Sequence, residues 1–201
     1  MEQIELSEKV DAIKDVLDRS ALYRHSLSPV FLFCGCAGLF ASGLALVLNI
    51  NQATGILLYW MALALLTASV SLALLMRQAH KNNEIFWQGP IKRMATAVFP
   101  PLLVGAMGGI YCLYFFPDST FVSGQAVIAW MALYGLALNS ASIVLAKNIR
   151  LLGWVFIIGS LVTVFLFELE LEKPYLQHLT MGLSFGLLHL LQGVKEWRAN
   201  G

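Results

Sequence analysis

Six long apolar runs dominate this sequence and limit what it can fold into. Each is close to the roughly 20 apolar residues that a helix needs to cross the hydrocarbon core of a bilayer. The 201 residues are 58% hydrophobic and only 12% charged, whereas a soluble domain has about 25% charged residues. The runs are residues 30–50, 55–76, 94–116, 121–146, 151–167 and 175–194. We therefore predict an all-α fold, a polytopic transmembrane helical bundle with six spans.

The basic residues predict the orientation of this bundle. If the N-terminus is cytoplasmic, all but one of the 13 Lys and Arg residues fall on the cytoplasmic side, and only Lys173 lies outside. Cytoplasmic loops of membrane proteins carry such an excess of basic residues. The prediction is N-in/C-in topology, with a cytoplasmic segment of residues 1–28, a six-helix transmembrane domain of residues 29–195 and a cytoplasmic tail of residues 196–201.

The N-terminal segment has the pattern of an amphipathic helix over residues 4–24. Its apolar residues share one face: Leu6, Val10, Ile13 and Leu17. Ser28-Pro29 is expected to separate this helix from the first span, because the residue before a proline avoids helical backbone. The helix could pack under its own bundle, contact a partner protein or a second copy, or lie on lipid. Lipid binding favours a basic helix, and acids outnumber bases in residues 1–25.

Two of the runs carry stripes of small and polar residues at helical spacing. In the last run the stripe consists of His178, Gly182, Gly186, His189 and Gly193. In the fourth run it consists of Ala132, Gly135, Asn139, Ser142 and Ala146. Such stripes let the backbone of another helix approach closely. We expect close helix packing along both faces.

Asn139 and His189 are predicted to lie at the same depth, in the cytoplasmic half of the membrane. A polar group left bare in lipid costs several kcal/mol, so we predict a hydrogen bond between them, direct or through a water molecule. With Ser142 and Arg150 they make up the candidate binding cluster. The histidine stripe leaves three roles open: packing, binding or proton handling by His189, and haem ligation by His178 and His189.

Several stretches together resemble a family of six-span bacterial integral membrane proteins. They are DVLDRSALYRHSLS, RQAHKNNEIFWQGPIKR, WMALYGLALNSASIVLAKNIRLLGW and GLSFGLLHLLQGVKEW. The resemblance implies a location in the bacterial cytoplasmic (inner) membrane and places Asn139, Arg150 and His189 among the recurrent polar positions of the family. It implies no activity. The family tends to have a tryptophan early in the last span, where this chain has Leu179, Thr180 and Met181.

These observations favour a non-enzymatic membrane protein that acts through partners, as an accessory or sensor-like subunit. The lipid bilayer is its first partner, and residues 4–24 are the predicted contact for a protein or a second copy. A carrier or channel for a small, mostly neutral solute is the alternative, and a membrane enzyme or haem protein is a third class. No Lys, Arg or Asp lies in mid-span, which weakens ion-coupled transport. No cofactor, metal site or catalytic residue is predicted, and a net charge of +1 argues against nucleic acid.

Overall fold

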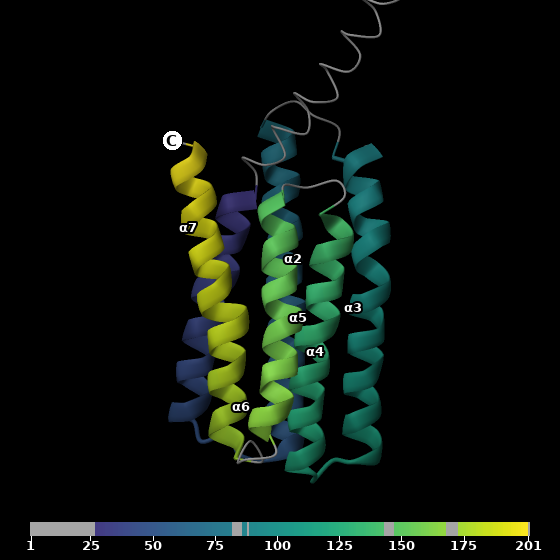
Figure 1. Cartoon of the computed structure of the whole chain (residues 1–201), viewed down its shortest axis with the longest axis vertical. Helices are drawn as coiled ribbons and strands as arrows, with labels where there is room; N and C mark the ends of the chain where they lie inside the picture. Colours follow the sequence, from purple (N-terminus) through teal and green to yellow (C-terminus); the bar gives the residue numbers. More distant parts are fainter. Residues whose placement is uncertain (1–26, 82–85, 88, 143–146, 168–172, 201) are drawn as a thin grey trace, which may run out of the picture.

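The computed structural model of the chain is a bundle of nearly parallel and antiparallel helices (Figure 1). It describes residues 27–81, 86–87, 89–142, 147–167 and 173–200, and these residues contain no strand. The predicted N-terminal amphipathic helix of residues 4–24 lies outside them. The helices are the first helix Leu27–Val47, α2 Ala53–Lys81, α3 Gly89–Phe115, α4 Thr120–Ala141, α5 Lys147–Phe167 and a last helix in three parts, α6 Pro174–Met181, η1 Gly182–Leu188 and α7 His189–Asn200.

Five of the helices are long and apolar enough to cross a membrane: the first helix, α2, α3, α4 and α5. The last helix runs without a break through α6, η1 and α7, and its middle part is a π-helix, with wider turns than an α-helix. We call this continuous element the last helix. The all-α fold predicted from the sequence is therefore confirmed, and five of the described helices could cross a membrane.

The helix ends follow local sequence signals. Asn49 has a positive φ of 51°, and the Ile50 N–H donates to the Ala45 carbonyl at 3.1 Å, as in the Schellman motif that ends many helices. Ser119 caps α4 by accepting a hydrogen bond from the Val122 N–H at 3.2 Å. Pro174 is the first residue of the last helix. Its missing N–H costs nothing there, because the N–H groups of the first turn have no acceptor within the helix.

Helix bounds and predicted spans differ at several ends. Ser28 and Pro29, predicted to precede the first span, lie in the first turn of the first helix, where proline is tolerated. The last helix continues to Asn200, through most of the predicted tail, and α4 ends at Ala141, with 143–146 outside the described residues. The hydrocarbon sets where a span ends, whereas helix formers and caps set where a helix ends.

The described basic residues gather at one end of the bundle, which we call the basic end. It holds the C-terminal ends of α2 and α7 and the N-terminal ends of α3 and α5 (Figure 1). Short connections close the opposite end, where Lys173 also lies. Exposed aromatic rings mark both levels, Trp87 and Trp197 at the basic end and Tyr114 and Tyr175 at the other. Such rings are typical of membrane–water interfaces.

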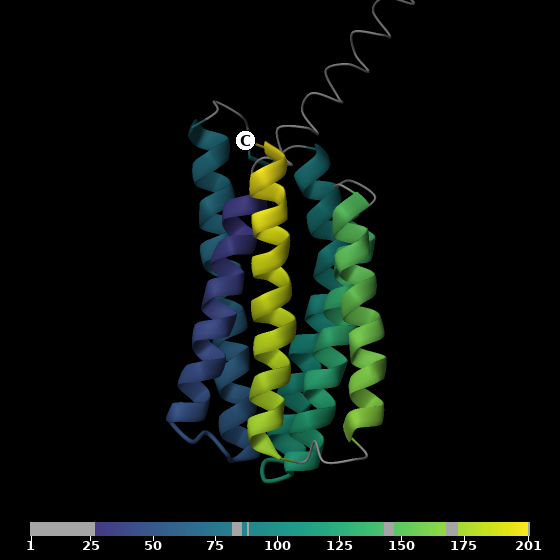
Figure 2. The ribbon, with the colours of Figure 1, turned by 60° about the vertical axis from the view of Figure 1, so that its left-hand side comes forward.

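The first and last helices run antiparallel and touch along their backbones (Figure 2). A Cβ added to Gly38 would lie 2.9 Å from the Cα of Gly186, and one added to Gly35 would lie 2.5 Å from the backbone of Leu190. Ser42 Oγ also donates to the His178 carbonyl at 2.8 Å. The glycine stripe of the last helix thus seats the first helix, because only glycine allows this approach.

The stripe of the fourth run packs against a different helix. A Cβ on Gly135 of α4 would lie 2.7 Å from the Gly153 carbonyl of α5. Asn139 faces the same contact, since a Cβ on Gly153 would lie 2.5 Å from its Nδ2. Ala146 lies outside the described residues. The two stripes therefore give close packing as predicted, but against separate partners and not against each other.

Two glycines of the first helix provide a matched test of this packing. We expect Gly38→Ala to lower the free energy of unfolding by about 1–3 kcal/mol, because its Cβ would press on backbone that cannot turn away. Gly43 faces open space, so Gly43→Ala should be neutral or stabilise by up to about 1 kcal/mol through helix propensity. Thermal or denaturant unfolding in detergent micelles measures both, and equal stabilities would contradict the close approach.

Candidate functional site

The last helix carries a line of buried polar side chains along the face that it turns into the bundle. We call these residues the polar column: Gln177, His178, Ser184, His189, Gln192 and Glu196, all at most 8% exposed. Polar groups within a membrane are costly unless they are paired, and intramembrane histidines and carboxylates are candidate functional groups. The column starts at the opposite end of the bundle and finishes at the basic end.

At its start the column bonds to α4 and α2. Gln177 accepts from Ser123 Oγ and donates to the Thr120 carbonyl, both at 2.9 Å. The Trp60 indole N–H donates to His178 Nδ1 at 3.0 Å, so Nδ1 carries no proton. His178 Nε2 therefore holds the proton and donates to the Ile50 carbonyl at 2.8 Å. Both nitrogens of His178 are engaged, which leaves neither available as a metal or haem ligand.

At its centre His189 is enclosed by aromatic rings. Phe31, Phe156 and Phe185 lie 5.8, 5.6 and 6.1 Å from the imidazole, centroid to centroid, and Phe185 stacks at 17°. The Tyr134 hydroxyl lies 2.6 Å from His189 Nε2. We call these four rings around His189 the histidine cage. It fills the middle of the bundle with close-packed side chains.

The second nitrogen of His189 is unusual. Nδ1 is buried and has no hydrogen-bond partner among the residues that the structure describes. A hydroxyl both donates and accepts, so the Tyr134 contact at Nε2 suits either neutral tautomer of His189. The π-helix Gly182–Leu188 ends directly before His189, and π-helical turns occur frequently at functional sites.

At the basic end the column finishes on a carboxylate held by amides. Glu196 Oε1 accepts from Gln192 Nε2 at 2.7 Å and from Asn148 Nδ2 of α5 at 3.4 Å. Lys195 Nζ in turn donates to Asn148 Oδ1 at 3.4 Å. Among the residues that the structure describes, no three His, Cys, Asp or Glu side chains come together in a metal-binding group.

Three of the four residues of the predicted cluster come together, away from the histidine. Arg150 Nε donates to Ser142 Oγ at 3.1 Å, and Ser142 Oγ donates to the Asn139 carbonyl at 2.6 Å. The Asn139 amide donates to the Gly135 carbonyl at 3.1 Å. These contacts join α4 to the first turn of α5.

Among the described residues, Asn139 and His189 make no direct hydrogen bond, so the direct form of that prediction is wrong. Tyr134 takes the place of Asn139 as the partner of His189. The two α4 residues are five positions apart, which turns them about 140° from each other on a helix. Tyr134 therefore faces the last helix while Asn139 faces α5.

Sequence reasoning also missed most of the polar column. It weighed charged groups and histidines in the spans and passed over the amides Gln177 and Gln192. A signal was present, since His189, Gln192 and Glu196 follow helical spacings of three and four. Tyr134 gave no comparable signal, because a tyrosine in an apolar run is ordinary.

Comparison of this chain with protein-family models, with curated proteins and with solved structures finds no match.

A double-substitution experiment tests the Tyr134–His189 pair. Tyr134→Phe and His189→Phe should each lower stability by about 1–3 kcal/mol, because each leaves a buried polar group alone. The double variant should cost less than the sum, since two apolar rings suit the cage. Tyr111→Phe, at an exposed position of α3, is the control and should change little. Strictly additive costs would show that the two side chains do not interact.

Proposed function

We propose that this chain is a six-span protein of the bacterial inner membrane, with both ends in the cytoplasm, that acts through partners as a non-enzymatic accessory or sensor-like subunit. The sixth span is the last helix, whose three parts together exceed the roughly 20 residues that a span requires. Its polar column turns inward, which explains how a helix with so many polar groups can stand among five apolar ones. The family resemblance supports the location.

The charge distribution supports the orientation. Described Lys and Arg residues cluster at the basic end, and the positive-inside rule assigns that end to the cytoplasm. The connections at the opposite end are short, and Lys173 is their one basic residue among several acidic ones.

Thiol labelling tests the orientation, in a chain whose cysteines Cys34, Cys36 and Cys112 are replaced by alanine. A membrane-impermeant reagent should label Asn51→Cys and Asp118→Cys in intact cells. Lys92→Cys and Arg198→Cys should react only after the membrane is opened. Labelling of the last two positions on opposite sides would contradict an even number of spans.

The functional proposal depends on one observation: side chains that connect the helices fill the interior of the bundle. The polar column bonds helix to helix, and the histidine cage occupies the centre with packed rings. A carrier would instead need a wet cavity lined by Asn139, Ser142 and His189, but Ser142 bonds to Asn139 while His189 bonds to Tyr134. With the interior committed to holding the helices together, recognition is left to the surface, chiefly the basic end and the predicted amphipathic segment of residues 4–24.

Gentle extraction from the native membrane, followed by affinity purification, tests this role. The wild-type chain should retain a protein partner or a second copy. A variant with serine in place of the four apolar stripe residues, at positions 6, 10, 13 and 17, should lose it. The control variant changes the charged faces of the same segment without altering net charge: Glu8→Gln, Lys9→Gln, Lys14→Gln and Asp15→Asn. It should keep most of the partner, and equal retention by both variants, or a wild-type chain that purifies alone, would refute the proposal.

A further inference from the structure

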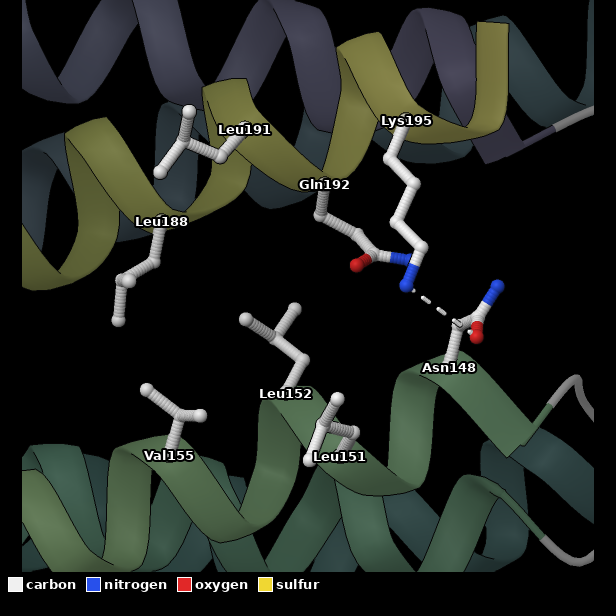
Figure 3. A pocket seen from close by; sticks show the side chains of 8 residues that line it. All are labelled: Asn148, Leu151, Leu152, Val155, Leu188, Leu191, Gln192 and Lys195. Carbon is white, nitrogen blue, oxygen red and sulfur yellow. Dashed lines mark hydrogen bonds between the residues drawn. The ribbon is translucent and has the colours of Figure 1, made fainter. Parts of the chain in front are cut away.

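A groove of about 170 Å³ opens between α5 and the last helix at the basic end. Its walls are apolar and its rim is polar (Figure 3). The wall residues are Leu151, Leu152, Val155, Leu188 and Leu191, and the rim residues are Asn148, Gln192 and Lys195. Leu151 and Leu191 are 60% and 57% exposed, so the groove faces outward, toward the surroundings of the bundle.

The groove is long enough along α5 to reach from the headgroup region of a membrane into its hydrocarbon. Its α5 wall runs from Asn148 to Val155, which is about two helical turns, and a helix rises 1.5 Å per residue. The headgroup region of each leaflet is about 5–8 Å thick. With the basic end at the membrane surface, the rim lies at headgroup level and the leucines lie in hydrocarbon.

Lys195 is available to a ligand at the rim. Its side chain reaches across the mouth of the groove to Asn148 (Figure 3). That contact is 3.4 Å long, beyond the usual range for a strong N–H···O bond. An ammonium group has three donors, so Lys195 can exchange or keep this contact and still donate to a phosphate oxygen.

The local charge favours an anion. Lys195 and, one turn further, the exposed Arg198 are positive. The N-terminus of α5, which carries the positive end of the helix dipole, begins at Lys147 with no acidic residue in its first turn. The opposing charge is that of Glu196, which is 6% exposed and turned toward Gln192 and Asn148.

We propose that this groove is a binding site for an anionic phospholipid of the cytoplasmic leaflet. One acyl chain lies between α5 and the last helix, against the leucines. The headgroup phosphate accepts hydrogen bonds from Lys195 at the rim. Basic pockets between membrane helices recognise lipid headgroups in this way. The inference uses the proposed membrane orientation and does not depend on the partner-binding role.

Lipid retention by the purified full-length chain tests the site. The protein is stripped of lipid in detergent and offered an equal mixture of phosphatidylglycerol, phosphatidylcholine and diacylglycerol, and native mass spectrometry reports what stays bound. Phosphatidylglycerol should be preferred. Lys195→Gln should weaken its retention about fivefold, from roughly 1 kcal/mol per basic contact, and Lys195→Arg should restore it.

A second variant tests the groove itself. Val155→Trp places an indole against the apolar wall and should remove bound lipid. Ile158→Trp, on the same helix but outside the groove, and Lys92→Gln, at the basic end on α3, are the matched controls and should bind like the wild type. Val155 and Ile158 are 39% and 55% exposed, and unfolding midpoints verify that both variants fold.

Each outcome decides the proposal. Preference for phosphatidylglycerol that depends on Lys195 and on an open groove supports it. Equal retention of the charged and zwitterionic lipids, equal loss in the control variants, or lipid-free protein under all conditions would overturn it. The partner-binding role would stand in each of those cases, because it is tested by the protein that purifies with the chain.

Discussion

The apolar interior of a helix bundle offers few hydrogen bonds, and this constraint governs how the last helix is held. A polar group without a partner in that medium costs several kcal/mol. Gln177 therefore reaches Ser123 of α4, His178 reaches Trp60 of α2, and Glu196 reaches Asn148 of α5. Apolar packing by itself discriminates poorly between helices of similar apolar composition. The hydrogen bonds of the polar column are directional, so they determine how the last helix is rotated about its own axis.

Glycine supplies the complementary half of the arrangement. Gly182, Gly186 and Gly193 of the last helix pack against the first helix, and Gly35 and Gly38 of the first helix pack against the last. Ser28 and Ser42 tie the same two backbones together by donating to the carbonyls of Gly193 and His178. The last helix therefore has two packing faces: a glycine face that allows close backbone contact and a polar face that forms hydrogen bonds.

Two places in the bundle differ from this pattern of paired polar groups and packed glycines: His189 and the groove beside Lys195. Among the residues that the structure describes, the buried side-chain atom without a hydrogen-bond partner is His189 Nδ1, whereas Nε2 contacts the Tyr134 hydroxyl. The π-helix ends directly before this residue. The histidine cage surrounds it with rings, and the Tyr134–His189 contact joins α4 to the last helix. The groove beside Lys195, by contrast, opens to the outside.

The sequence by itself determined that the chain is all-helical and apolar enough to cross a membrane, because run length and the scarcity of charge decide which solvent suits a helix. It also located the close-packing faces, since glycine spacing is a property of a single helix. The choice of partners required the tertiary structure. Which helix Gly186 touches, and whether His189 meets Asn139 or Tyr134, depends on the rotation of each helix about its axis. That rotation is set jointly by all the neighbouring helices, so no single span encodes it.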